Sequence, residues 1–328
     1  MRTAMTFMLA TSVSLTAAAS ADYFDNFSTT WLPSGAQAGT LAGTVDGQNG
    51  WTTRDAFTSA TTVGRWDQQV KQVSDANGTR NVFRMSNAIT SSTYSSQVFS
   101  ATSGQVAGEA NAALWNDRGT NGSAPFSPPQ YGAYAATDTF YSKVSFRSAT
   151  GAAQSGLALT LSASAKQSTV RMSWLQLQDT GSGFNLNVYD LLGNGAFPAA
   201  ATTIASGLSY SDLHTIETGI TFVDGVSTVG GQIYSNDVLK IWLNGSLIHT
   251  GSTWESYYYN FERITAGTPR LQAVDSMLFR VAGTAATGTS GNGFYFEDFA
   301  IGNTIVPAPG AIALLGAAGL VGSRRRRS

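Results

Sequence analysis

Short stretches of alternating polar and apolar residues follow one another through most of this chain, and they restrict its fold more than any other feature. Thr139–Phe146 is one example, and Asp237–Leu243 is another. Asn244-Gly245 comes directly after the second stretch and is followed by Ser246–Gly251. Because an Asn-Gly pair supplies the positive φ angles of a type I′ turn, the stretches on either side of it are predicted to form a β-hairpin.

A second hairpin is predicted where Val170–Gln178 alternates, breaks at Asp179–Gly183 and resumes as Phe184–Tyr189. Between residues 22 and 305 there is no long stretch of helical periodicity and no repeat of fixed length. Many short strands separated by turns predict an all-β fold, an antiparallel β-sandwich or jelly roll. Gly119–Pro129 is interpreted as a surface loop of one domain rather than as a linker between two.

The first 21 residues have the pattern of a signal peptide. Arg2 is followed by the uncharged stretch Ala4–Ala19, and Ala19-Ser20-Ala21 has the small residues of a cleavage site. Cleavage after Ala21 would start the mature chain at Asp22. We therefore expect export from the cytoplasm.

The last 23 residues, 306–328, have three parts. Val306, Pro307, Ala308 and Pro309 come first, the uncharged segment Gly310–Gly322 follows, and the chain closes with Arg324, Arg325, Arg326, Arg327 and Ser328. The 13 apolar residues would form a helix of roughly 20 Å, which is short of a hydrocarbon core of about 30 Å. The segment is thus expected to hold the chain in the inner membrane only transiently, as a short transmembrane helix; the alternative is an ordinary C-terminal anchor.

This tail resembles the PEP-CTERM signal that exosortase systems recognise in Gram-negative bacteria. The resemblance implies an exosortase-type processing enzyme as partner, and a final location at the cell surface or in the extracellular matrix. The usual Pro-Glu-Pro is replaced here by Pro307-Ala308-Pro309. The predicted organisation is a signal peptide (1–21), a single β-sandwich domain (22–305) and a sorting tail (306–328).

Composition excludes several classes of function for residues 22–305, which we call the body of the chain. The chain has no cysteine, so packing rather than disulfides must stabilise it in an oxidising compartment. Of its 19 Lys+Arg, five lie in the two terminal segments, which leaves 14 against 20 Asp+Glu and a net charge of −6. Nucleic-acid binding needs clustered cations, and we do not expect it here.

Three strand motifs resemble those of concanavalin A-like lectin/glucanase and laminin-G-like domains. They are the stretch Leu213–Ile220 with its His214-Thr215-Ile216, the hairpin around Asn244-Gly245, and the closing stretch Gly293–Gly302. The resemblance implies a jelly roll in which the closing strand lies beside the first one, Tyr23–Phe27. It is compatible with sugar binding and with polysaccharide cleavage.

No catalytic residue is assigned from the sequence. Glucanases of this fold carry Glu-x-Asp on one strand, and none of the five glutamates here has an Asp two residues later. Glu297 and Asp298 are adjacent, so they are predicted to point to opposite faces of their strand. The alginate-lyase pattern of Arg, Gln-x-His and Tyr-x-Lys strands is not recognised. Of the two histidines, His214 is interpreted as a structural residue at a strand start or as a general base, and His249 as solvent-facing or packed across the hairpin.

Sugar binding is the chemistry that the aromatic residues favour. Trp254, Tyr257, Tyr258 and Tyr259 belong to a dense aromatic run for which core or loop packing is the favoured interpretation, and exposed rings that contact a glycan are the alternative. No cofactor is expected. Calcium is a weak candidate, with oxygen ligands from Asp22, Asp25 and Asp298 near the paired ends of the body.

Three classes of function remain open. The first is a noncatalytic, exported surface or matrix protein whose lectin-like domain binds exopolysaccharide. The second is a divergent polysaccharide hydrolase or lyase, and the third is a purely structural envelope protein. The missing carboxylate pattern favours the first over the second, and the sequence does not separate the first from the third.

Overall fold

The computed structural model describes residues 23–25, 27, 48–55, 67–75, 78–87, 96–108, 136–166, 171–190, 198, 200–223, 227–230, 232–258, 273–281 and 292–305. The predicted signal peptide and sorting tail lie outside these residues, and so does the loop 119–129. Within the described ranges, no helix is long and apolar enough to cross a membrane.

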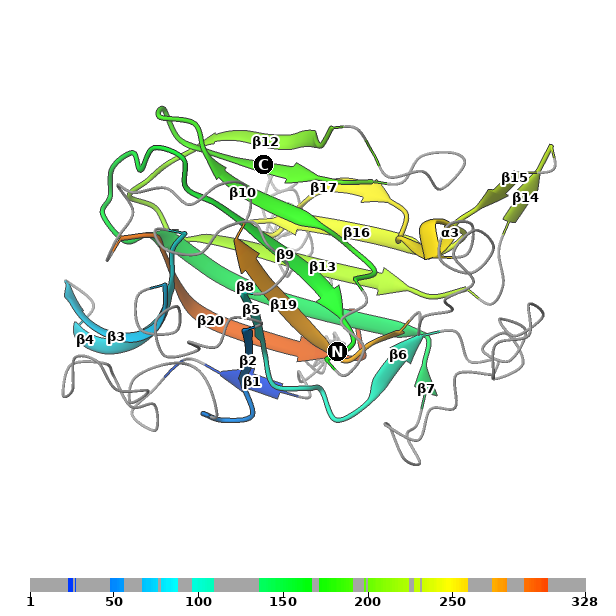
Figure 1. Ribbon diagram of the computed structural model, residues 1–328, viewed down its shortest axis with the longest axis horizontal. Helices are drawn as coiled ribbons and strands as arrows, with labels where there is room; N and C mark the ends of the chain where they lie inside the picture. The colour runs from blue at the N-terminus through cyan, green and yellow to red at the C-terminus, as the bar shows by residue number, and fades with distance from the viewer. Residues whose placement is uncertain are drawn as a thin grey trace, which may run out of the picture.

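Two antiparallel sheets form the body of the molecule (Figure 1). The larger one has eight strands in the order β17-β16-β13-β8-β20-β4-β3, with β1 also paired to β20. Its strands are β1 (Tyr23–Asp25), β3 (Gln68–Asp75), β4 (Gly78–Met85), β8 (Thr139–Ser148), β13 (His214–Thr221), β16 (Val238–Leu243), β17 (Ser246–Gly251) and β20 (Phe294–Gly302).

The second sheet has seven strands in the order β12-β11-β10-β9-β19-β5-β2 and faces the reader in Figure 1. Its strands are β2 (Thr52–Asp55), β5 (Ser96–Phe99), β9 (Ala158–Ser164), β10 (Leu175–Asp179), β11 (Phe184–Val188), β12 (Thr202–Leu208) and β19 (Ser276–Val281). Smaller elements are β14 (Ser227–Val229) with β15 (Gln232–Tyr234), the three-stranded sheet of β6 (Val106–Gly108), β7 (Ala136–Thr137) and β18 (Ala273–Val274), and the single turn of helix α3 (Glu255–Tyr257). The predicted all-β sandwich is confirmed.

The core between the sheets is rich in aromatic rings. Trp51 is fully buried, with its ring 5.0 Å from that of Phe299 and 5.6 Å from those of Phe83 and Phe279. Each such ring contributes about 1.5–3 kcal/mol of hydrophobic stabilisation. Since side chains alternate along a strand, this inward set leaves the intervening residues of both sheets on outward faces.

The predicted pairings are observed. Asn244 and Gly245 have φ angles of 49° and 81°, and they join β16 to β17. The loop Asp179–Gly183 joins β10 to β11 in an antiparallel pair. The closing strand β20 lies beside β1, with Tyr23 opposite Ile301.

One prediction about β20 is wrong. Phe296 pairs with Phe146 and Asp298 with Ser145, so Glu297 is an extra residue that forms a β-bulge. Phe296 and Phe299 are both buried in the core, which leaves Glu297 and Asp298 together on the outward face of the eight-stranded sheet. Adjacent residues share a face here because the bulge interrupts the alternation.

Candidate functional site

The outward face of the seven-stranded sheet carries a row of polar residues that crosses six of its strands. Leu161, Leu177 and Phe279 belong to the core, so their strand neighbours point outward. The strand register places six outward residues opposite one another. We call them the polar row, which runs from β12 to β5 through Thr203, Asn187, Gln176, Thr160, Arg280 and Gln97. Thr203 is exposed and Gln176 partly exposed, while the other four are buried.

One half of the polar row is a ladder of amides. Asn187 donates from Nδ2 to Gln176 Oε1 at 3.0 Å and to Gln178 Oε1 at 3.1 Å. Its own Oδ1 accepts a hydrogen bond from Thr203 Oγ1 at 2.8 Å. Each glutamine thus uses its oxygen in the ladder, while its Nε2 group has no acceptor among the described residues. These outward donors are available to a ligand.

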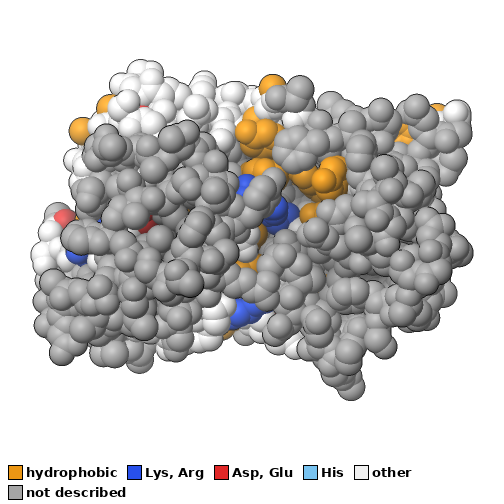
Figure 2. Space-filling model, viewed as in Figure 1, with side chains coloured by type: hydrophobic (Ala, Val, Ile, Leu, Met, Phe, Trp, Pro, Cys, Tyr) orange, Lys and Arg blue, Asp and Glu red, His pale blue; other side chains and the backbone are white. Residues whose placement is uncertain are grey.

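Guanidinium groups gather beside the other half of the row. The ring of Trp174 lies 4.7 Å from the guanidinium carbon of Arg171 and 4.9 Å from that of Arg280. Ser162 lies on the neighbouring outward position of β9, where its buried hydroxyl has no hydrogen-bond partner among the described residues. Figure 2 shows Lys and Arg side chains in the middle of this face, next to hydrophobic ones. The face therefore combines amide donors, cations and an aromatic ring.

The aromatic run predicted to contact a glycan lies beneath this cluster. Trp254 is 3% exposed and Tyr258 is 5% exposed, so the favoured interpretation of core packing is confirmed for both and the alternative of exposed glycan contacts is wrong for them. The Trp254 indole donates to the backbone oxygen of Tyr189 at 2.9 Å, and its ring lies 5.3 Å from that of Trp174. The Tyr258 hydroxyl donates to the backbone oxygen of Arg171 at 3.0 Å.

These buried rings act as a support that positions Trp174 and Arg171. Tyr257 is partly buried against Trp254, and a glycan contact there stays a prediction. Tyr259 lies outside the described residues.

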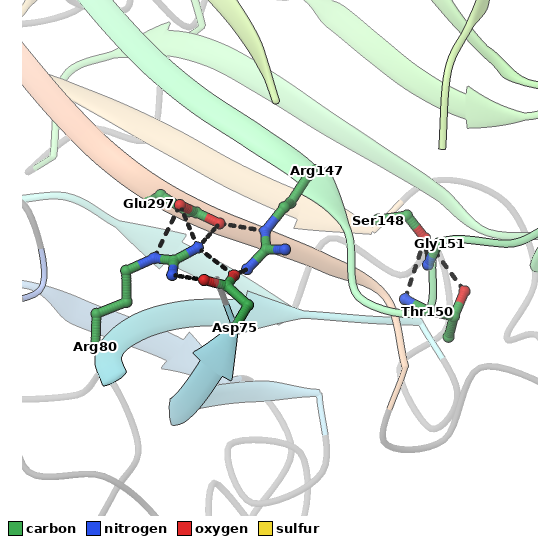
Figure 3. Close-up of polar contacts among 7 residues, drawn as sticks. All are labelled: Asp75, Arg80, Arg147, Ser148, Thr150, Gly151 and Glu297. Carbon is green, nitrogen blue, oxygen red and sulfur yellow. Dashed lines mark hydrogen bonds and ion pairs between the residues drawn. The ribbon is translucent and has the colours of Figure 1, made fainter. Parts of the chain in front are cut away.

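The outward face of the eight-stranded sheet is also polar, but its charges neutralise one another (Figure 3). Arg80 donates to Asp75 Oδ1 at 2.8 Å and to Glu297 Oε2 at 2.9 Å. Arg147 contacts the same two carboxylates, with 2.9 Å to Asp75 Oδ2. The four side chains form a closed ring, and hydrogen bonds to the carboxylates raise the pKa of Arg80.

Groups capable of acid–base chemistry lie further along this second face. Tyr141-Ser142-Lys143 has the Tyr-x-Lys spacing, which inspection of the sequence missed, and both side chains point outward from β8. The Tyr141 hydroxyl donates to Glu217 Oε2 at 2.6 Å. Burial, followed by this hydrogen bond, raises the pKa of Tyr141. Burial also raises the pKa of Asp298, while Lys143 opposes the shift.

Both histidines have structural partners. His214 starts β13, where it is buried and its Nε2 lies 2.9 Å from the backbone oxygen of Ser209. This agrees with the structural interpretation. His249 Nε2 lies 3.1 Å from Asp190 Oδ2, a contact that links β17 to the end of β11.

Two of the three residues proposed for calcium, Asp25 and Asp298, lie on opposite faces of the larger sheet. Asp25 accepts hydrogen bonds from the Tyr23 hydroxyl and the Phe27 backbone, and Asp298 lies on the outward face of the larger sheet. No group of three or more His, Cys, Asp or Glu side chains among the described residues is placed to hold a metal ion. Asp22 lies outside those residues.

Comparison with protein-family models and with curated proteins gives no match. The solved structures that resemble this chain include an endo-β-1,4-glucuronan lyase from the fungus Trichoderma reesei, with 11% identity over 88% of this chain and 98% of that one, and a TM-score of 0.41. Alginate lyase A1-II′, a member of polysaccharide lyase family 7, has 14% identity over 78% and 95% of the two chains, and a TM-score of 0.41. An alginate lyase from a Chlorella virus has 11% identity over 77% and 99%, and a TM-score of 0.37.

Proposed function

We propose that the protein binds a polysaccharide along the polar row, as an exported lectin-like protein of the cell surface or matrix. The observation that supports this most is the amide ladder. Gln176 and Gln178 present outward donors at neighbouring positions of one face, and sugar hydroxyls accept such bonds. Arg171, which is partly exposed, lies beside these donors, and Trp174 and Arg280 are buried under the same face. Binding at one site is weak, on the order of 10 µM to 1 mM, and acts through many contacts on one polymer.

Affinity electrophoresis of the purified protein through gels containing different polysaccharides tests this proposal. Retention by at least one polymer is expected, with weaker retention of Gln176→Ala. Lys240→Gln is the matched control, because Lys240 is exposed on the outward face of the other sheet. Absence of retention by every polymer would favour a purely structural envelope protein.

Cleavage of a polysaccharide is the second candidate function, and residues on the outward face of the eight-stranded sheet support it. Burial raises the pKa of Asp298, which lies on the same face as Glu297, Lys143 and Tyr141, and a carboxyl group whose pKa is raised is better suited to donate a proton. Release of reducing ends or unsaturated uronates from a polysaccharide panel, lost in Asp298→Asn, would establish this activity. Products that persist in Asp298→Asn would place the chemistry elsewhere.

Export and sorting are a separate part of the proposal. Its support is the pattern of residues 1–21 and 306–328. We expect an exosortase-type enzyme to release or transfer the body near Pro307-Ala308-Pro309. Intact-mass measurement of the protein from the native cell surface should give Asp22 as the first residue and no Arg324–Arg327. A full-length chain at the outer surface would reject the proposal.

A further inference from the structure

The last three described residues of the chain cross the outward face of the eight-stranded sheet. Strand β20 ends at Gly302, which pairs with Tyr141 of β8, and β8 separates β20 from β13. Ile305 nevertheless lies over Gly219 of β13, where a Cβ atom added to the glycine would be 3.1 Å from Ile305 Cγ2. Residues 303–305 therefore pass over β8, and we call them the strap.

Gly219 and Trp242 form the contact site of Ile305. The Cβ position above Gly219 also lies 3.1 Å from Trp242 Cζ3 and 3.2 Å from Trp242 Cη2, so the indole ring and the Ile305 side chain share the space over this glycine. Trp242 points outward, since Ile241 and Leu243 on either side of it belong to the core, yet it is only 9% exposed. Any side chain in place of Gly219 would therefore push on Trp242 and on the strap.

Two polar contacts hold the beginning of the strap. The Thr139 hydroxyl donates a hydrogen bond to the backbone oxygen of Asn303, and Asn303 Nδ2 donates to Gln105 Oε1 at 2.7 Å. Hydrogen bonds at partly exposed positions contribute only modestly to stability, and Ile305 keeps part of its surface exposed. The strap is thus docked by contacts that can open while the sandwich stays folded.

We propose that release of the strap from Gly219 and Trp242 controls processing of the sorting tail. The inference rests on the sorting proposed above and concerns access to the cleaved segment. Pro307-Ala308-Pro309 starts two residues after Ile305. An enzyme that binds its peptide in an extended form needs residues on both sides of the cleaved bond, so it must take Ile305 off the sheet. The rate of cleavage then follows the fraction of molecules whose strap is open.

The strap also limits how far the body can lie from the membrane. Gly310, where the apolar segment begins, is five residues after Ile305, and five residues span at most about 18 Å. Release moves the last held residue back to Gly302, which lengthens the tether by three residues, or about 10 Å. An open strap therefore leaves more room for an enzyme between the membrane surface and the body.

The first experiment measures opening of the strap without the native enzyme. The full-length chain in mild detergent is treated with proteinase K, and mass spectrometry follows cleavage within residues 303–309. Gly219→Ala should be cut there about three- to tenfold faster than the unmodified protein, because its methyl group displaces Ile305. Thr250→Ala is the matched control, since Thr250 is exposed on the same face, and it should leave the rate unchanged. Equal rates in Gly219→Ala and the unmodified protein would overturn the inference.

Thr139→Val separates opening of the strap from loosening of the whole sandwich. It removes the hydroxyl that holds Asn303, keeps the shape of the side chain and leaves the cleaved segment unchanged. Cleavage within residues 303–309 should accelerate about two- to fivefold, while the urea midpoint of the body stays close to that of the unmodified protein. If faster cleavage in both variants came only with an equal loss of global stability, the open form would be the unfolded body, and the inference would be wrong.

The second experiment follows processing in the native cell. Pulse labelling and intact-mass measurement give the rate at which each variant loses Arg324–Arg327. Gly219→Ala and Thr139→Val should be processed faster than the unmodified protein, and Thr250→Ala at the same rate. Unchanged or slower processing of the first two variants would reject control by the strap and leave the proposed sorting standing. No processing in any variant, the unmodified protein included, would reject the proposed sorting itself.

Discussion

The outward faces of the two sheets are both polar, yet they use their polar side chains in different ways. On the eight-stranded sheet, Arg80 and Arg147 share the carboxylates of Asp75 and Glu297 in a closed ring. On the seven-stranded sheet, Asn187 ties two glutamines together through their oxygens and leaves their donors pointing outward. The charged ring on the first face is satisfied by its own residues, whereas the glutamine donors on the second face keep hydrogen-bonding capacity for another molecule.

The difference follows from the chemistry of the groups. Ionised carboxylates only accept and guanidinium groups only donate, so an equal number of each can satisfy one another. A side-chain amide has both a donor group and an acceptor oxygen. When the two glutamines use only their oxygens in the ladder, their N–H donors stay available. A dense cluster of charges therefore does not mark a binding site by itself. The remaining donors on a neighbouring, less charged face are the better indication.

The largest loss of stability is expected at Gly219, where side chains pack closely on the outward face of the eight-stranded sheet. Gly219 lies in β13, and a Cβ atom there would be 3.1 Å from Ile305 Cγ2 and 3.1 Å from a ring carbon of Trp242. Gly219→Val should lower the free energy of unfolding by about 1–3 kcal/mol, because neither neighbour can move without loss of packing. Urea denaturation measures this effect. Thr221→Val, on the same strand and face, is the control and should change stability much less.

The next effect concerns the charged ring itself. Glu297→Gln removes one of its two carboxylates and leaves two arginines facing Asp75 alone. We expect a loss of about 1 kcal/mol in unfolding free energy, since the arginines are about a quarter exposed and partly screened by solvent. Polysaccharide affinity should stay the same. A loss of affinity as large as that of a polar-row variant would contradict the distinction between the faces.

A smaller effect on stability, but a clear one on binding, is expected in the amide ladder. Asn187→Ala frees the oxygens of Gln176 and Gln178, which are exposed enough to bind water, so stability should change by less than about 1 kcal/mol. Affinity for a bound polysaccharide should fall about five- to tenfold. Asn185→Ala is the matched control, because Asn185 lies on the same strand and face but outside the row. Equal losses in both variants would show that the ligand does not follow the row.

Local patterns in the sequence were enough to predict the strands and several of their pairings. Asn244-Gly245 dictates a turn through its backbone angles, and the alternation on both sides dictates the faces of the strands. The polar row could not be predicted in this way. It joins strands far apart in the chain, such as β5, β9 and β19, whose order and register are set by the packing of the whole sandwich.

Two further differences have equally local causes. The run from Trp254 to Tyr258 is rich in aromatic rings, but their number does not tell which of them face the core. Trp254 is buried because it packs under the ring of Trp174. At Glu297 a single extra residue shifts the alternation, and nothing in the residue types marks it. Bulges and buried aromatic supports depend on the partner strand, which the local sequence does not contain.

The smallest expected effect is a pH dependence that comes from Asp298. Burial raises its pKa above the ordinary value of 3.8; Lys143 opposes the shift, Glu297 adds to it and Arg80 opposes it again. The folded state therefore holds this proton more tightly than the unfolded state does. The resulting stabilisation is complete below the ordinary pKa and is lost as the pH rises through the folded pKa. Asp298→Asn lacks this loss, so its unfolding free energy relative to the unmodified protein should rise in urea titrations as the pH is raised above 3.8, the ordinary pKa of this carboxyl group. A difference that stays constant or falls as the pH rises would show that burial does not raise the pKa of Asp298 in the folded protein.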